Sequence, residues 1–317
     1  MKWFLTLLLF FYSINQQSLA QELVVPKELE NKTISIVIGY GPGGRNDIFA
    51  RYLTNHIKNT YNLNFIVVNK PGASGALGAK FVAESEADGT TLHLANDALM
   101  LGILQGSPGW PQKSQLEPVV NIWSTYNMLI GSRHLQSDNI NNIITEMRQT
   151  PSKFNYATVF VADGLQFELI LNHFKIKEVV GIPFKSGPEI KNSLANNTVQ
   201  FWITGIGDGI ATIKSGIAKP LAVTADTRLR ELPQTPTFNE LIPNAIFKNM
   251  TSLYVPKNTA SNIKEFYNRL FALVYDTAEI KKHFEDQNYN LLKVNSLENV
   301  RKEWEQHWSS VQSYLIK

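Results

Sequence analysis

The chain has 317 residues, of which 44% are hydrophobic and 18% are charged, and its formal net charge is +3. This length and composition predict a soluble globular protein with one large or two ordinary α/β domains, and the small, evenly spread charge excludes a nucleic-acid-binding protein. The chain contains no cysteine, which excludes a thiol nucleophile, a thiolate metal site and a disulfide.

The first twenty residues have the layout of a secretory signal peptide. Residues 3–12 form an almost unbroken apolar run, and Ser18 and Ala20 place small side chains at positions −3 and −1 of a cut before Gln21. The apolar run is too short to span a membrane, and a lipoprotein anchor needs a cysteine. We therefore expect residues 1–20 to be removed and the mature protein to be periplasmic. The alternative is an anchor that stays attached.

Two strand-to-helix turns near the start of the mature chain are rich in glycine. The β-branched residues 34–38 predict a strand that ends in GYGPGG at residues 39–44, before a helical pattern. The apolar residues 65–68 predict a second strand, which is followed by NKPGASGALG at residues 69–78. Such turns let a ligand approach the backbone, and a helix start offers free N–H groups with a partial positive charge. Both turns are therefore predicted to bind an anion.

Strand-like runs and helical patterns alternate along the chain, which predicts parallel sheets covered by helices on both faces. The predicted strands are residues 34–38, 65–68, 91–95, 127–130, 155–158, 178–182, 199–203, 220–224 and 252–255. Turn-rich stretches at residues 102–118 and 233–249 mark candidate boundaries. We expect the chain to leave a first lobe near Tyr126 and to return near Ser252, with a second lobe inserted between them. A ligand would then bind between the lobes.

The motifs of catalytic and nucleotide-binding sites are incomplete. Asn46 stands where a dinucleotide fingerprint needs its third glycine, and Phe81 stands where a P-loop needs a hydroxyl. The six histidines are scattered without metal-ligand spacing and are interpreted as core or surface residues. Trp304 and Trp308 lie on the apolar face of a predicted helix and are interpreted as core residues. Asp47, at a predicted helix start, is interpreted as accepting backbone hydrogen bonds rather than as a catalytic acid. We expect no enzymatic activity, no cofactor and no metal.

Several segments, in one order along the chain, resemble the substrate-binding proteins of tripartite tricarboxylate transporters, also called Bug receptors. The segments are PGGRND at residues 42–47, VVNKPGASG at 67–75, ADGTTL at 87–92, KFNYA at 153–157, PFK at 183–185, LAVT at 221–224 and LPQTPT at 232–237. The similarity runs from about residue 34 to the C-terminal helices. It implies a type II periplasmic-binding-protein fold, in which two α/β lobes enclose a ligand cleft.

The resemblance also implies a function and a set of binding residues. We place the first, discontinuous lobe at residues 21–126 and 249–317 and the inserted lobe at residues 127–248. The cleft would bind a small organic anion such as a dicarboxylate or an amino acid, and the receptor, expected to be a monomer, would deliver it to membrane permease subunits. Carried over by position, the ligand-binding residues are Tyr40, Gly43, Gly44, Arg45, Ala73, Ser74, Gly75, Asn96, Asp97, Ala98, Ala162, Asp163, Gly164, Leu165, Lys185, Thr204 and Gly205.

Three of these positions depart from the pattern of the family. Arg45 stands where a glycine or another small residue is usual, and Asp97 and Asp163 lie in loops where small hydroxyl residues are usual. We hypothesise that Arg45 anchors an anion while an aspartate faces an amine or hydroxyls, which favours an amino acid or a monocarboxylate over citrate. The alternatives are a solvated arginine and two aspartates that form caps or turns.

Two alternative functions would use the same cleft. In the first, the protein presents its ligand to a membrane sensor kinase instead of a permease, and in the second it is a small-molecule enzyme. The missing nucleophile elbow and metal cluster argue against the enzyme. A neighbouring permease or kinase gene would separate transport from sensing.

Overall fold

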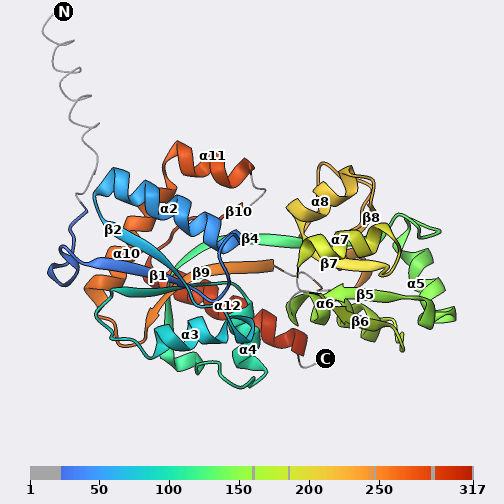
Figure 1. Ribbon diagram of the computed structural model, residues 1–317, viewed down its shortest axis with the longest axis horizontal. Helices are drawn as coiled ribbons and strands as arrows, with labels where there is room; N and C mark the ends of the chain where they lie inside the picture. The colour runs from blue at the N-terminus through green and yellow to red at the C-terminus, as the bar shows by residue number, and fades with distance from the viewer. Residues whose placement is uncertain are drawn as a thin grey trace, which may run out of the picture.

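The computed structural model describes residues 23–158, 161–184, 186–243, 245, 248–286 and 290–315. The elements form two α/β lobes that lie side by side (Figure 1). The predicted signal peptide lies outside the described residues. Within the described part of the chain, each helix is too short or too polar to cross a membrane.

The first lobe is built on a sheet with the strand order β2-β1-β3-β9-β4. Its strands are β1 (Thr33–Ile38), β2 (Asn64–Asn69), β3 (Thr91–Ala95), β4 (Leu116–Ser132), β9 (Lys248–Pro256) and β10 (Asn290–Leu291), which pairs with β4. Strands β1, β2 and β3 are parallel, and β9 is antiparallel to both β3 and β4.

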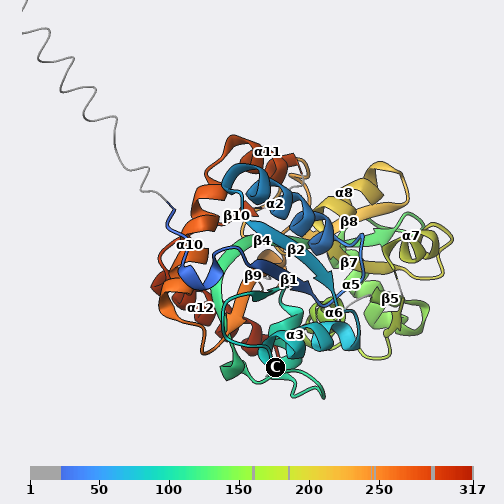
Figure 2. The same cartoon turned by 60° about the vertical axis from the view of Figure 1, so that its left-hand side comes forward.

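Helices cover both faces of this sheet, as α2 and α3 on opposite sides of it make clear (Figure 2). One face carries α2 (Arg45–Tyr61), α10 (Ser261–Tyr275) and α11 (Ala278–Asp286). The other face carries α3 (Ala76–Ala83), α4 (Ala98–Leu104) and α12 (Leu297–Leu315).

The alternation of side chains along β1 explains the two-sided core. Ile36 packs into the cluster under α2 and α10, whereas the next residue, Val37, packs into the cluster under α3 and α12. This is the period of two that a strand imposes on its side chains. Trp304 and Trp308 of α12 are 5% and 6% exposed and belong to the second cluster, so their interpretation as core residues is confirmed.

The second lobe has the strand order β4-β7-β5-β6, with β8 on the other side of β4. Its strands are β5 (Asn155–Thr158), β6 (Val180–Pro183), β7 (Phe201–Gly205) and β8 (Ala218–Val223). The helices on one face are α5 (Ile140–Gln149), α6 (Val161–His173) and α9 (Phe238–Leu241), and those on the other are α7 (Gly187–Ala195) and α8 (Ile206–Lys214).

Strand β4 belongs to both sheets and sets how the lobes face each other. Its residues up to Tyr126 pair with β9, whose first residue, Lys248, lies opposite Tyr126. From Asn127 onward β4 pairs with the antiparallel β7, whose last residue, Gly205, lies opposite Asn127. The carboxyl ends of β5, β6 and β7 therefore point back toward the first lobe, and those of β1, β2 and β3 point toward the second. Ligands of α/β proteins bind at this kind of edge.

Each predicted strand overlaps an observed one, but the prediction missed the first half of β4 and took residues 102–118 as a boundary. Buried polar residues interrupt the apolar pattern of this half-strand. Asn121, for example, donates from Nδ2 to the Val300 carbonyl at 3.2 Å and accepts from the Ser252 hydroxyl at 2.9 Å. A polar residue in this pairing looks like a loop residue in the sequence.

Candidate ligand-binding site

One buried carboxylate holds the loop between β1 and α2. Asp47, in the first turn of α2 and 3% exposed, accepts a hydrogen bond from the Gly43 N–H at 2.9 Å, as predicted. Arg51 pairs with it at 3.0 Å, and Asn69 Nδ2 donates both to Asp47 and to the Tyr40 carbonyl at 3.0 Å. The hydrogen bond from Arg51 outweighs burial and holds the pKa of Asp47 below its usual value. The shape of this loop is therefore fixed without a ligand.

The loop after β2 has a left-handed backbone over three successive residues. The φ angles are 47° at Ala73, 57° at Ser74 and 105° at Gly75. This conformation costs a non-glycine residue about 1–2 kcal/mol, and such strain gathers at binding sites. The Tyr40 hydroxyl donates to the Ser74 carbonyl at 3.1 Å and so joins the two glycine-rich loops. Successive N–H groups in such a turn suit an anion.

Glycine is required where these two loops meet. A Cβ added at Gly39 would lie 2.7 Å from the Cα atom of Gly75, and one added at Gly78 would lie 2.7 Å from the Cα atom of Gly39. Real Cβ contacts are longer, so the two loops pack backbone against backbone. Their spacing is set by the fold.

The third candidate loop, residues 96–98, connects β3 to α4. Asn96 accepts a hydrogen bond from the Ala98 N–H at 3.2 Å. Asp97 is 7% exposed, and its Oδ1 accepts hydrogen bonds from the Met250 N–H and from His307. Of the two alternatives for Asp97, these protein partners support a structural contact rather than a ligand-facing carboxylate.

The second lobe contributes Thr204 and Gly205 at the end of β7, where α8 begins, and Gly164 and Leu165 in α6. The Thr204 side chain is buried. Leu165 is half-buried and packs against the apolar cluster of the first lobe that contains Leu99. Leu165 thus makes a contact between the lobes.

Four candidate residues are described only in part or not at all. For Arg45, Ala162 and Asp163 the structure describes the backbone, which places Arg45 in the first turn of α2 and the other two in the first turn of α6. Lys185 lies outside the described residues.

The same edge of the second lobe carries polar residues that the sequence analysis missed. The Tyr126 hydroxyl donates to Asp226 at 2.6 Å, and burial, with this hydrogen bond, raises the pKa of Tyr126 well above its usual value. Asn127 Nδ2 donates to Gln166 at 3.0 Å, and the Asn127 N–H donates to the Thr224 hydroxyl at 2.7 Å. Thr224 and Asp226 lie directly after β8. The predicted strand at residues 220–224 was therefore the sequence signal that could have indicated polar residues at this edge.

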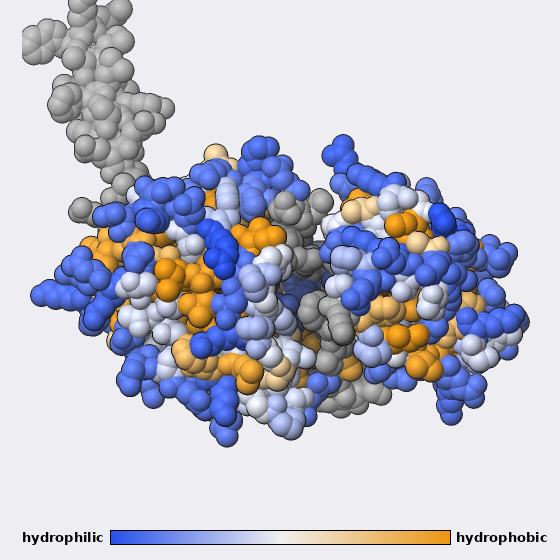
Figure 3. Space-filling model, viewed as in Figure 1, coloured by the Kyte–Doolittle hydropathy of each residue, from blue (hydrophilic) through white to orange (hydrophobic). Residues whose placement is uncertain are grey.

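In the part of the chain that the structure describes, five helices of eight or more residues begin at the facing edges, namely α2, α3, α6, α7 and α8. Each start carries a partial positive charge and N–H groups without helical partners. Figure 3 shows a hollow between the lobes at this level. The arrangement favours a negatively charged guest held largely by backbone groups.

Two of the described histidines, His93 and His56, make contacts within the first lobe. His93 is buried, and burial lowers its pKa to about 4. His56 contacts the Glu279 carboxylate at 3.1 Å. Among the residues that the structure describes, no three histidine or acidic side chains are grouped as a metal site would need.

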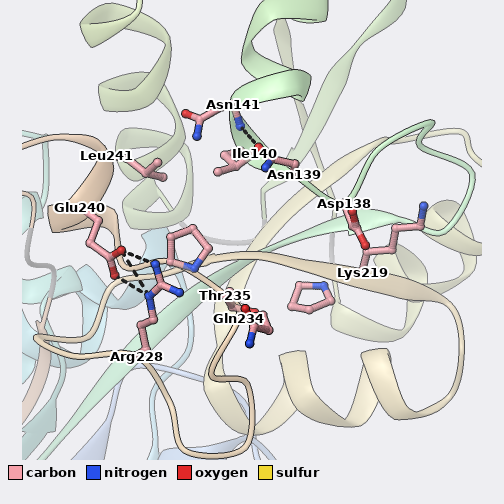
Figure 4. A pocket seen from close by; sticks show the side chains of 12 residues that line it. Asp138, Asn139, Ile140, Asn141, Lys219, Arg228, Gln234, Thr235, Glu240 and Leu241 are labelled. Carbon is pink, nitrogen blue, oxygen red and sulfur yellow. Dashed lines mark hydrogen bonds and ion pairs between the residues drawn. The ribbon is translucent and has the colours of Figure 1, made fainter.

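A separate pocket of about 500 Å³ lies in the second lobe between α5, β8 and α9 (Figure 4). It borders the start of β8, at the edge of the sheet opposite the hollow. Three of its four charged groups have protein partners, since Arg228 pairs with Glu240 and Lys219 donates to the Leu135 carbonyl, and the fourth, Asp138, is exposed. This pocket is therefore not the candidate site.

Comparison with known proteins agrees with the resemblance seen in the motifs. Residues 49–308 match the family described as Tripartite tricarboxylate transporter family receptor. Protein BugT of Bordetella pertussis is 28% identical over 246 residues, which cover 75% of this chain and 74% of BugT.

Two solved structures from Rhodopseudomonas palustris have a similar fold. Rpa4515 with adipate has a TM-score of 0.78 at 21% identity, covering 90% of this chain and 96% of Rpa4515. MatC with bound malate has a TM-score of 0.73 at 19% identity, covering 88% of this chain and 98% of MatC. At these identities the likeness establishes the fold alone, and it confirms the predicted two-lobe fold class.

Proposed function

Because this chain belongs to the tripartite tricarboxylate transporter receptor family, we propose that it captures a small organic carboxylate outside the cytoplasm and delivers it to membrane permease subunits. The observation that carries the proposal is the pair of interlocked glycine-rich loops, which follow the ends of β1 and β2 that point toward the second lobe. Relatives solved with adipate and malate support a carboxylate as the ligand class.

The proposed mechanism is closure of two lobes. The hinge would be the strand pair at Tyr126 and Lys248, which are paired where β4 passes from one sheet to the other. The loops of the first lobe and Arg45 would hold a carboxylate. Asp226, exposed beside Tyr126, would accept from a hydroxyl or ammonium group of the ligand. Asp226 is thus proposed beside Asp163 for the role that the sequence hypothesis gave to one of two aspartates, Asp97 or Asp163.

The proposal includes export by the signal peptide, with cleavage between Ala20 and Gln21. N-terminal sequencing of the exported protein tests this part. A mature chain that begins at Gln21 is expected, and a retained N-terminus would contradict cleavage.

Ligand binding is tested by thermal shift on protein that has been unfolded and refolded to remove any bound guest. The panel would include malate, succinate, adipate, citrate, glutamate and glutarate. A ligand at a hundredfold excess over its Kd stabilises the fold by about 2.7 kcal/mol. At least one acid is expected to raise the Tm, and mass spectrometry of the guest before refolding identifies it independently. No shift from any acid and no copurified carboxylate would overturn the proposal.

A further inference from the structure

The carboxylate of Asp97 joins three elements that are far apart in the sequence. Its Oδ1 accepts one hydrogen bond from the Met250 N–H of β9 at 3.1 Å and one from His307 Nε2 of α12 at 2.8 Å. These partners lie 153 and 210 residues away along the chain. One buried oxygen therefore fixes the loop of residues 96–98 against β9 and α12.

Both partners lie close to the place where the lobes meet. Met250 pairs with Ser124, two residues before Tyr126 in β4, where that strand passes into the second lobe. Helix α12 packs on α4 and on α6 of the second lobe. Leu165 of α6 packs on the cluster that contains Trp308, the residue after His307. A shift of Asp97 would therefore reach both the crossing strands and the contact between the lobes.

The hydrogen bond between Asp97 and His307 is also an ion pair when the imidazole is protonated. The side chains of His307 and Asp97 are 12% and 10% exposed, so water screens the pair weakly. Burial disfavours the imidazolium, but the charge and the hydrogen bond of Asp97 raise the pKa of His307 above its usual value, against the repulsion of Lys248. Protonation of His307 therefore adds an ion pair to this hydrogen bond, and deprotonation removes it.

The other charged and titratable groups around His307 do not replace Asp97. Lys293 and Glu303 line the same pocket as His307, and Glu303 already accepts from Asn121 and Asn295. Tyr254 of β9 is buried and accepts from the Trp304 indole. Helix α4 has the sequence ALMLGIL and carries no charge. On α6, Glu168 pairs with Tyr156 of its own lobe, and the Asp163 side chain is outside the described part.

We propose that Asp97 and His307 form a protonation-dependent clamp that positions the loop of residues 96–98, so that ligand affinity falls as pH rises through the titration of His307. Both are positioning residues, because they act on the loop and not on the ligand. The direction follows from linkage. A group whose pKa is higher in the folded state than in the unfolded state stabilises the fold fully at pH values below its unfolded-state pKa, which is 6.5 for His307. This stabilisation is lost as the pH rises through the folded-state pKa.

The first test needs no ligand. Hydrogen exchange of the Met250 amide is followed by NMR from about pH 5.5 to about pH 8.5 and corrected for the intrinsic pH dependence. In the unaltered protein the corrected exchange rate should rise about fivefold across this range, because deprotonation of His307 removes the ion pair that helps to hold the Asp97 carboxylate in place, while the carboxylate itself stays charged. His307→Gln keeps a donor without a charge, so its corrected rate should be pH-independent and equal to the high-pH rate of the unaltered protein.

The second test depends on the proposed function and uses malate and adipate as probes in calorimetry over the same pH range. The affinity of the unaltered protein should fall about fivefold as pH rises, and that of His307→Gln should stay flat. The matched control is His134→Gln, an exposed histidine of the second lobe that contacts the Ala195 carbonyl. This variant should keep the full pH profile.

The outcomes separate the clamp from the proposed function. The clamp is overturned if the corrected exchange rate of the Met250 amide is independent of pH in the unaltered protein, or if His307→Gln keeps the pH profile of the unaltered protein. Either result holds regardless of whether malate or adipate binds. If the exchange rate of the Met250 amide depends on pH but neither malate nor adipate binds, the result supports the clamp and counts against the proposed function. If His307→Gln does not fold, Asp97→Asn, which keeps an acceptor for the Met250 N–H, gives the same comparison.

Discussion

The two lobes differ in the groups that they place at the hollow between them. In the first lobe these groups belong to the backbone of two loops, which pack against each other at Gly39 and Gly75 and are held by the buried Asp47. In the second lobe the described edge is made of side-chain pairs, such as Tyr126 with Asp226. Backbone N–H groups are present whatever the side chain, whereas side chains can be exchanged one at a time. We therefore expect the first lobe to set the ligand class and the second to discriminate among its members.

The largest effect is expected where the backbone of the first lobe is forced apart. In Gly39→Ala the new methyl group would overlap the backbone of Gly75, which has no flexible end to move away. We expect a loss of about 3 kcal/mol in the free energy of unfolding, at the upper end of typical overpacking costs. Binding of every acid in the panel should be lost together. Urea unfolding and calorimetry measure the two effects.

Gly41→Ala is the matched control for this substitution. It lies two residues further along the same loop, and no described atom lies within 4 Å of an added Cβ. Stability and affinity should stay near those of the unaltered protein. Equal affinities in the two variants would contradict a backbone-built first lobe.

A smaller effect is expected from Asp47→Asn, which keeps the shape of the side chain but removes its charge. Hydrogen bonds to charged groups contribute about 1.5–3 kcal/mol, and the value here should lie at the low end because Arg51 is half exposed to solvent. Affinity for all acids should fall in parallel. Asp276→Asn, at an exposed aspartate paired with Lys281, is the control and should change little.

The pH dependence of this variant gives a second readout. The pKa of Asp47 is lowered on folding, so its stabilisation is present above the unfolded value of 3.8 and is lost as pH falls through the folded value. The free energy of unfolding of the unaltered protein should therefore decrease below about pH 4. In Asp47→Asn this decrease should be smaller by the part that Asp47 contributes. Identical acid slopes in urea unfolding would rule out the assigned role.

The sequence predicted the parts of this molecule that depend on local pattern. Apolar runs such as residues 34–38 become strands because their period buries one side chain on each face in turn. The glycine-rich turns were found for the same reason, since a turn and a close approach leave a local signature. Asp47 was correctly predicted to accept a backbone hydrogen bond, and this was possible because the donor, the Gly43 N–H, is only four residues away.

The rest depended on contacts that a single sequence does not reveal. Asp97 was carried over by position as a ligand-binding residue, with a structural cap or turn as the alternative, and its partners Met250 and His307 come from the far end of the chain. The contact of Leu165 with the apolar cluster of the first lobe likewise depends on the approach of α4 and α12 to α6, which no local pattern indicates. The direction of a side chain at a strand end is decided by tertiary packing.

The smallest effect, and the one that separates the lobes most sharply, is expected from Asp226→Asn. Asp226 is exposed at the carboxyl end of β8 and holds the Tyr126 hydroxyl at 2.6 Å. If its carboxylate accepts from a ligand hydroxyl or ammonium, the variant should lose about fivefold in affinity for malate or glutamate while keeping its affinity for succinate or glutarate. These pairs differ by a single polar group, so their ratio cancels any general loss of binding.

The control for this prediction is Asp138→Asn, an exposed aspartate in the pocket at the opposite edge of the same lobe. It should leave each ratio unchanged, as should Gly41→Ala in the first lobe. A parallel loss for both members of a pair would make Asp226 part of the common anchor. The lobes would then share the work of holding the carboxylate, and the division between a backbone that sets the class and side chains that discriminate would be wrong.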